Sequence, residues 1–318
     1  MERRRLGPTG ACVGSLGLGT ATWGHGTDRG EAVEQVRLLL EAGGDLIDIG
    51  LDSVDAELAG AVLADASAPA HAFLSIRSAP APSARDLLDE LDRSLGALGV
   101  DHTDMWSIAG WDPRLPWDEL VGALAVAVAT GRARYVGSSP EHAWHAALCG
   151  AGLALHPQRS PLAAITSACS LLDIRSARSA ADVAAALGAS LIAAAPLAGG
   201  VLTGKYRHST PPDSRGASER YGAHLQAYRG ARARPVVDGL VAAADGLGTT
   251  PGVLAVAWVR AQPQVASAVV GARTVHQWRA ALAGIDTVLP AEIRSALDEV
   301  SSAARAVGDD GSAGVSTG

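Results

Sequence analysis

The feature that most constrains this chain is an alternation of short apolar runs with longer amphipathic stretches. The runs at 46–50 (LIDIG) and 72–77 (AFLSIR) are short and apolar, as the buried strands of parallel sheets are. The stretches at 56–66 and 83–99 repeat apolar residues every three to four positions, as helices do. This alternation predicts a parallel sheet whose strands are connected by helices.

The same pattern continues toward the C-terminus, interrupted by a polar loop at about 204–232. With one strand at 15–20, the strands number eight, which favours a closed (β/α)8 TIM barrel over an open doubly wound sheet. The further strands are expected at 103–110, 133–139, 161–169 and 265–273, and a strand running into a loop at 190–200. The further helices are expected at 116–131, 140–151, 179–189, 234–248, 250–263 and 275–285.

Length and composition agree with a single domain. The chain has 318 residues, 48% of them hydrophobic, and contains no internal linker. We expect one barrel over residues 1–301. The segment 302–318 is rich in Ala, Gly and Ser, and is predicted to be a disordered tail.

Several partner classes are disfavoured by charge and composition. The net charge is −7, so no basic face for nucleic acid is expected. No apolar run is long enough to cross a membrane, and the N-terminus lacks the apolar core of a secretory signal. The cysteines, Cys12, Cys149 and Cys169, are odd in number and widely spaced, which favours a reducing cytoplasm. No cysteine or histidine pair has metal-ligand spacing, so no metal is expected.

Five segments, collinear over roughly residues 3–300, together resemble the aldo-keto reductase superfamily. RRLGPTGACVGSLGLGTATWG is similar to its N-terminal β-hairpin and first strand, DLIDIG to the strand with the catalytic aspartate, and SLGALGVDHTDMWSI to its fourth strand. PLAGGVLTGKY at 196–206 is the most specific motif, and resembles the branch of potassium-channel β subunits and bacterial relatives. VVGARTVHQW at 269–278 resembles the cofactor-binding turn after the last strand.

The resemblance implies NADP(H)-dependent reduction of carbonyls by a tetrad of Asp, Tyr, Lys and His. In that family the tyrosine protonates the developing alkoxide, while the lysine and aspartate lower its pKa and the histidine orients the carbonyl. This chain keeps the aspartate as Asp48. It has Ser53 or Val54 at the tyrosine position, Arg77 at the lysine position and Ala109 at the histidine position.

No shift of the alignment restores the tetrad. The first tyrosine of the chain is Tyr135 and its single lysine is Lys205, both far from the loops concerned. Serine is a very weak acid, and arginine stays protonated. Asp48 and Arg77 therefore form either a structural ion pair at the barrel mouth or a site at which Arg77 binds an oxyanion or carboxylate of a substrate.

The resemblance also places a cofactor at the C-terminal mouth of the barrel, with its phosphate side kept. The residues around 196–200, with Lys205 and Arg215, match contacts to the pyrophosphate. Arg273 suits the 2′-phosphate of NADP. The whole expected cofactor set is Gly19, Thr20, Ser139, Pro196, Leu197, Gly200, Lys205, Arg215, Gly271, Arg273 and Gln277.

The remaining cofactor contacts are replaced. A nicotinamide-binding Asn and Gln are Pro140 and Thr166, and the stacking aromatic residue is Cys169. Two residues that face the adenine are Ala280 and Ala281. NADP(H) binding and its loss both stay open on this evidence.

A pocket for a small organic molecule is expected at the mouth. Its candidate walls are Trp23, Trp111, Thr166 and Cys169, with ordinary packing as the alternative for the tryptophans and an inert buried thiol as the alternative for Cys169.

Three functions remain open. The first is a repurposed enzyme doing non-redox chemistry, such as cyclisation, dehydration or isomerisation, with Asp48 as acid or base. The second is a silent barrel with a binding or regulatory role. The third is an NADP(H)-dependent reductase with a relocated proton donor, for which Tyr221 and Tyr228 of the long loop are candidates. The sequence leaves the oligomeric state open.

Overall fold

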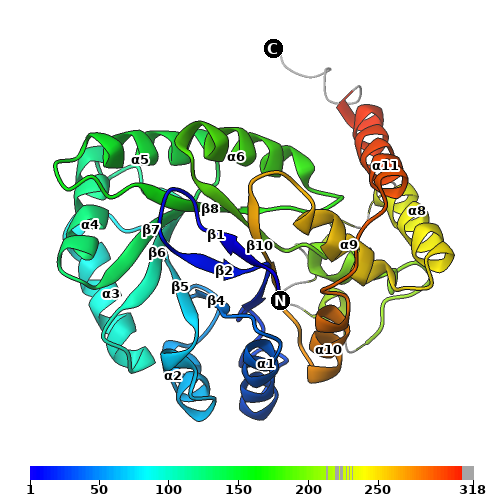
Figure 1. Ribbon diagram of the computed structural model, residues 1–318, viewed down its shortest axis with the longest axis horizontal. Helices are drawn as coiled ribbons and strands as arrows, with labels where there is room; N and C mark the ends of the chain where they lie inside the picture. Colours follow the sequence, from blue (N-terminus) through cyan, green and yellow to red (C-terminus); the bar gives the residue numbers. More distant parts are fainter. Residues whose placement is uncertain are drawn as a thin grey trace, which may run out of the picture.

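The computed structural model describes residues 1–309 except 213, 219–221, 223, 224, 227, 229 and 231. Eight parallel strands close into a barrel in the order β10-β3-β4-β5-β6-β7-β8-β9, which confirms the predicted TIM barrel (Figure 1). The barrel strands are β3 (Leu16–Gly19), β4 (Leu46–Gly50), β5 (Phe73–Ser78), β6 (Thr103–Ala109), β7 (Ala133–Ser139), β8 (Leu162–Ala168), β9 (Ser190–Ala194) and β10 (Val265–Val270).

Helices surround the barrel, and several begin at the side-chain caps that the sequence contains. Asp55 accepts a hydrogen bond from the backbone N–H of Leu58, and Ser83 from that of Asp86. The helices are α1 (Arg29–Glu41), α2 (Ala56–Asp65), α3 (Ala84–Leu98), α4 (Trp117–Ala129), α5 (Ala143–Leu155), α6 (Ile174–Leu187), α8 (Ala233–Gly246), α9 (Pro251–Arg260), α10 (Val275–Ala283) and α11 (Ala291–Asp309).

One expected boundary is confirmed and one is corrected. The strand expected to run into a loop over 190–200 ends at Ala194, and the 3-10 segment η2 (Ala198–Thr203) that follows is interrupted by the positive φ angles of Gly199 and Gly200. The tail expected to be disordered from 302 is helical as far as Asp309, since α11 packs against α8 and buries Leu297. Residues 310–318 of the expected tail lie outside the described residues.

An N-terminal hairpin closes one end of the barrel, also as predicted. Its strands, β1 (Arg3–Arg5) and β2 (Cys12–Gly14), pair antiparallel. Leu6 and Val13 of the hairpin are fully buried, in one cluster with residues that begin barrel strands, such as Leu46. The hairpin therefore covers the N-terminal end of the barrel, and the site must lie at the opposite, C-terminal mouth.

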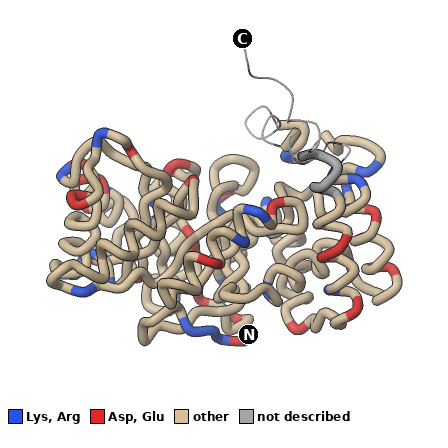
Figure 2. The backbone as a smooth tube through the Cα atoms, turned by 90° about the horizontal axis from the view of Figure 1, so that it is seen from above, with Lys and Arg blue, Asp and Glu red and all other residues tan. Residues whose placement is uncertain are grey.

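The outer surface carries charges of both signs. Acidic and basic residues are interspersed along the described chain, as Figure 2 shows. Within the described residues, no single helix has the length and apolar character needed to cross a membrane. Helices α8 and α9 meet that criterion only as a pair, bent by 101°.

Candidate site at the C-terminal mouth of the barrel

The predicted Asp48–Arg77 pair forms inside the mouth. In the parallel register Asp48 lies beside Ser75, and Arg77 follows two residues later on the same face of β5. The Ser75 hydroxyl donates to Asp48 Oδ1 at 3.1 Å, and Arg77 Nη2 lies 3.1 Å from Asp48 Oδ2. Arg77 Nε also donates to the same carboxylate, at 3.2 Å and 3.4 Å. Asp48 is 2% exposed, so this carboxylate is a buried acceptor with its partners in place.

The surroundings of Arg77 stabilise its protonated, positively charged form. The Asp48 carboxylate raises the pKa of Arg77, burial of the guanidinium opposes this, and Asp52 raises the pKa further. The side chain passes over Gly50, where an added Cβ would lie 2.8 Å from Arg77 Nη2. Arg77 is therefore a fixed cation and cannot act as a proton donor.

The other two tetrad positions carry no strong acid. Ser53 donates its hydroxyl proton to Asp52 Oδ1 at 3.0 Å, which draws Ser53 into the cluster around Arg77. Ala109 ends β6 beside Ser139 of β7. Together with Asp48, the four tetrad positions therefore present one carboxylate, one guanidinium, one hydroxyl and one methyl group.

The interior near this pair holds a hydroxyl that the sequence did not single out. Ser107 is in register with Arg77 on β6, which puts its side chain on the same, inner face of the barrel. It is fully buried, and its Oγ has no hydrogen-bond partner among the described residues. The two-residue period of β6 could have identified it, but only once the register with β5 was known.

A cavity of about 310 Å³ lies beside the mouth, between η2, α9 and α10. It brings together segments that are far apart in the sequence, at about 195–205, 215, 250–256 and 270–281. Eight of the eleven expected cofactor residues line it: Pro196, Leu197, Gly200, Lys205, Arg215, Gly271, Arg273 and Gln277.

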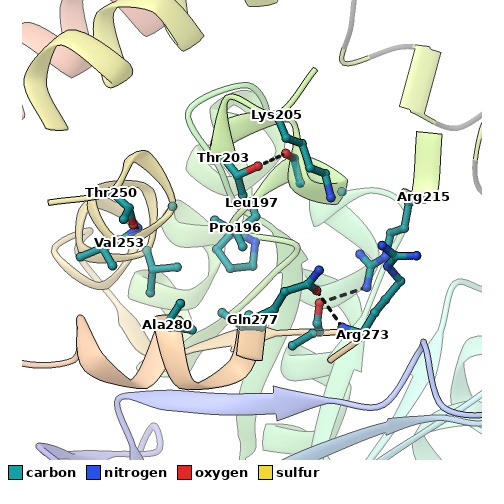
Figure 3. A pocket seen from close by; sticks show the side chains of 18 of the residues that line it. Pro196, Leu197, Thr203, Lys205, Arg215, Thr250, Val253, Arg273, Gln277 and Ala280 are labelled. Carbon is teal, nitrogen blue, oxygen red and sulfur yellow. Dashed lines mark hydrogen bonds between the residues drawn. The ribbon is translucent and has the colours of Figure 1, made fainter. Parts of the chain in front are cut away.

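Three cationic side chains gather on one side of this cavity. Figure 3 shows Lys205, Arg215 and Arg273 together, opposite an apolar wall that includes Val253 and Ala280. Burial lowers the pKa of Lys205, Arg273 and Arg215 lower it further, and Tyr206 opposes these effects. None of the lining residues is acidic, so an anion entering the cavity would reduce this mutual repulsion.

Two glycines keep the cationic side open. A Cβ on Gly200, whose φ is +95°, would lie 2.9 Å from Lys205 Nζ. A Cβ on Gly271 would lie 3.2 Å from Arg215 Nη2, which also donates to the Gly271 carbonyl at 3.0 Å. Backbone and cations thus approach each other closely, as a phosphate site requires.

The far wall of the cavity is apolar where the resemblance implied polar contacts to adenine. Ala280 and Ala281 of α10 line it, as the sequence predicted. The sequence did not single out Val253 of α9 or His276 of α10, which also line the cavity. Only the packing of α9 against α10 reveals them.

The three remaining cofactor candidates lie outside the walls of this cavity. Thr20 donates from its backbone and its hydroxyl to the Asp48 carbonyl, at 3.1 Å and 3.2 Å. The Gly19 carbonyl would lie 3.5 Å from a Cβ on Gly271, and Ser139 ends β7. These residues lie at or beside strand ends around the mouth, and Gly19 is close to Gly271 of the cationic side.

The expected nicotinamide end is compact. Thr166 is 2% exposed and its hydroxyl has no partner among the described residues, whereas Cys169 is 1% exposed. Burial raises the pKa of the Cys169 thiol to about 12, and Asp173 adds to this. Burial and the raised pKa both favour the inert-thiol alternative for Cys169.

The two tryptophans expected in the pocket differ. Trp23 is fully buried in the hydrophobic core, and its indole N–H donates to Gln35 Oε1 of α1 at 3.3 Å. This corrects the expectation that Trp23 lines a pocket. Trp111 is half-buried after β6 and stacks on Trp117 with ring centroids 5.0 Å apart.

The tyrosines of the described chain have other partners. Tyr206 accepts a hydrogen bond from the Gly216 N–H at 3.0 Å, and Tyr228 donates to Asp173 Oδ2 at 2.7 Å. Tyr135 stacks on Phe73 inside the barrel. Tyr221 lies outside the described residues. Within the described residues, no group of three or more His, Cys, Asp or Glu is placed to hold a metal ion.

Comparisons with known proteins agree with this architecture. The model of the Aldo/keto reductase family matches residues 15–302. YrpG, an uncharacterized oxidoreductase of Bacillus subtilis, is 27% identical over 66% of this chain and 62% of its own length. A proposed voltage-gated potassium channel subunit beta of Schizosaccharomyces pombe is 28% identical over 69% of this chain and 64% of its own length. The alignments with these two thus span less than two thirds of each relative. Protein tas of Escherichia coli is 25% identical over 94% of this chain and 97% of its own length.

Proposed function

This chain belongs to the aldo/keto reductase family, and we propose that it binds NADP(H) in the 310 Å³ cavity but carries out non-redox chemistry at the barrel mouth. The substrate is a small organic molecule, and the reaction is a cyclisation, dehydration or isomerisation. A cytoplasmic location is part of the proposal, because the three cysteines form no disulfide.

The observation that carries the proposal is the contrast between the two halves of the site. At the cavity, Lys205, Arg215 and Arg273 surround a space without acidic walls, and this donor set fits the phosphates of NADP(H). At the mouth, Ser53 and Ala109 replace the proton donor and the orienting histidine. When bound, the cofactor could supply a hydride, but at the tetrad positions the described residues include no tyrosine to protonate the product oxyanion.

The chain's own groups at the mouth suit acid–base and oxyanion chemistry. The Arg77 side chain is 20% exposed and that of Asp48 3%, so a substrate meets Arg77 first. Arg77 would stabilise negative charge that develops on a substrate oxygen. Asp48 would hold Arg77 in position and is the group that would take up a proton.

A specific observation also supports the second candidate, a silent barrel with a binding or regulatory role. The carboxylate oxygens of Asp48 are both engaged, by Ser75 and Arg77, so the pair is closed without a substrate. The third candidate, a relocated proton donor, has less support. Of its two candidate residues, Tyr228 donates to Asp173 within the fold, and Tyr221 lies outside the described residues.

Titration with NADPH, followed by fluorescence, tests the cofactor half of the proposal. We expect saturable binding to the wild-type protein and at least about a tenfold loss of affinity for Arg273→Ala and for Lys205→Ala, equivalent to about 1.4 kcal/mol each. Arg85→Ala is the matched control, since that side chain is 88% exposed on α3. Absence of NADPH binding to the wild-type protein would overturn the proposal.

Turnover assays test the chemical half. We expect no oxidation of NADPH with a panel of aldehydes and quinones, because Ser53 and Ala109 stand where the family's proton donor and orienting histidine are expected. Oxidation at the rate of an ordinary reductase of this family would disprove the non-redox proposal. Retained activity of Asp48→Asn on the true substrate would remove Asp48 from the mechanism.

A further inference from the structure

Helix α5 presents an apolar stripe to solvent on the outside of the barrel. Trp144 is 49% exposed, Leu148 45% and Leu155 87%, and Ala151 is exposed between them. Their spacing of four, three and four residues puts all four on one face of the helix. No residue of α5 is Asp, Glu, Lys or Arg.

The barrel does not need this stripe for its own packing. The opposite face of α5, which includes His145, Cys149 and Leu153, is buried against the rest of the fold. Six large hydrophobic side chains are exposed within the described residues, and four of them lie on α4 and α5: Val126, Trp144, Leu148 and Leu155. Apolar exposure is therefore concentrated on two neighbouring helices, which is typical of an interface and not of scattered surface residues.

Trp144 has the properties of an anchor for such an interface. Its ring centroid lies 3.9 Å from that of His145, 6.1 Å from that of Trp111 and 6.3 Å from that of Trp117. These rings restrict the indole while half of it stays exposed. Rigid, partly exposed tryptophans lose little entropy on binding and often dominate binding energy.

We propose that this stripe is a homodimer interface, in which α5 packs antiparallel against α5 of a second copy of the chain. A two-fold axis midway between positions 149 and 150 places Trp144 opposite Leu155, and Leu148 opposite Ala151. Leu148 thus meets the small side chain of Ala151, and Trp144 packs against Leu155, which is also large and apolar. This arrangement is independent of the function proposed for the barrel mouth.

Charge at the two ends of α5 favours a second copy as the partner. Glu141 precedes the helix and Arg159 follows it, and both are exposed. Antiparallel pairing brings Glu141 of one copy near Arg159 of the other, while the stripe between them buries no charge. The stripe and the charged residues at its ends are thus complementary to the same surface on a second copy, as a two-fold interface requires.

The size of the stripe indicates a weak dimer. A helix of 13 residues is about 20 Å long, so α5 alone covers less than the roughly 800 Å² that each partner contributes to a standard interface. We therefore expect dissociation constants of about 1–100 µM.

Sedimentation velocity and light scattering of the full chain, across that range of concentrations, test the proposal. We expect a reversible shift from monomer to dimer for the wild-type protein and a monomer at every concentration for Leu148→Asp. Leu247→Asp is the matched control, because Leu247 is 42% exposed outside this surface. Circular dichroism establishes that both variants are folded.

Charge reversal tests the antiparallel orientation. Glu141→Arg and Arg159→Glu should each weaken the dimer at low salt, and the double variant should restore it. The proposal is overturned if the wild-type protein stays monomeric, if Leu148→Asp still dimerises, or if Leu247→Asp dissociates the dimer equally. Failure of the double variant to restore association would overturn the orientation.

Discussion

Position 77 carries an arginine where the family resemblance implies a lysine. Both side chains are positively charged, but they differ in geometry and in how readily they lose a proton. The planar group of Arg77 contacts the Asp48 carboxylate through both Nε and Nη2, which a lysine could not do. The charge of Arg77 is permanent, and Asp48 is nearly fully buried. The pair therefore acts as one unit in which neither member is easily removed alone.

Removal of the Arg77 guanidinium should destabilise the fold. We expect Arg77→Met to lower the free energy of unfolding by about 3 kcal/mol, because it leaves the Asp48 carboxylate buried with Ser75 as its remaining partner. The double variant Asp48→Asn/Arg77→Met should lose less than the sum of the two single variants. Urea denaturation of the four proteins gives the coupling energy. Additive losses would show that the pair contributes no coupling.

The three thiols should differ in reactivity. Cys12 is exposed, whereas burial raises the pKa of both Cys149 and Cys169 to about 12. We expect one equivalent of an aromatic disulfide reagent to react with the native protein at pH 8, and three equivalents to react after denaturation. Rapid labelling of Cys169 in the native protein would instead show that the mouth opens.

At the scale of elements, the close approach of α2 and α3 depends on a glycine within a helix. A Cβ on Gly60 would lie 2.4 Å from the Ala97 carbonyl oxygen and 2.9 Å from the Leu98 Cα. The contact involves backbone atoms, so rotation of a side chain cannot relieve it. Glycine is poorly suited to helix interiors, and here packing overrides that preference.

Two alanine substitutions test this packing. Gly60→Ala should lower the free energy of unfolding by about 2 kcal/mol, since α2 and α3 must move apart. Gly96→Ala in α3 is the matched control, because a Cβ there meets nothing within 4 Å. It should raise stability by about 0.5 kcal/mol through its effect on the unfolded chain. Equal effects of the two substitutions would contradict the packing argument.

At the scale of the whole molecule, the N-terminal hairpin stabilises one end of the barrel, and the proposed binding site lies at the opposite end. Leu6 is fully buried within the end of the barrel that the hairpin closes, and the Gly7 N–H donates to Ser190 Oγ at 2.7 Å. The Asp48–Arg77 pair and the cationic cavity lie toward the other end, where the sites of TIM barrels are generally found. The hairpin thus contributes to the core although it lies outside the barrel sheet.

Truncation in the hairpin should therefore have a large effect. We expect Leu6→Ala to lower the free energy of unfolding by about 3 kcal/mol, through lost burial and a cavity at the barrel floor. Val288→Ala, at a side chain that is 86% exposed, should change it by less than about 0.5 kcal/mol. Chemical denaturation measures both. A small effect of Leu6→Ala would mean that the barrel end is closed without the hairpin.

Local patterns in the sequence determined the fold and much of the candidate site. Apolar periodicity and caps such as Ser83 act within a few residues, so they predicted the eight strands and most helices. The prediction that the tetrad is degenerate needed no structure either, because the chain has one lysine and no tyrosine before Tyr135. The motifs at 196–206 and 269–278 likewise supplied most of the cationic cavity.

Tertiary structure decided what depends on segments that are distant in the chain. Trp23 is a core residue because Gln35 of α1 receives its indole N–H, and Val253 becomes a cavity wall because α9 packs beside α10. Helix α11 extends beyond 301 because it has α8 to pack against. The exposed stripe on α5 likewise depends on how distant segments pack together. Its residues are apolar in the sequence, but only the closed barrel determines which of them are buried and which remain exposed to solvent.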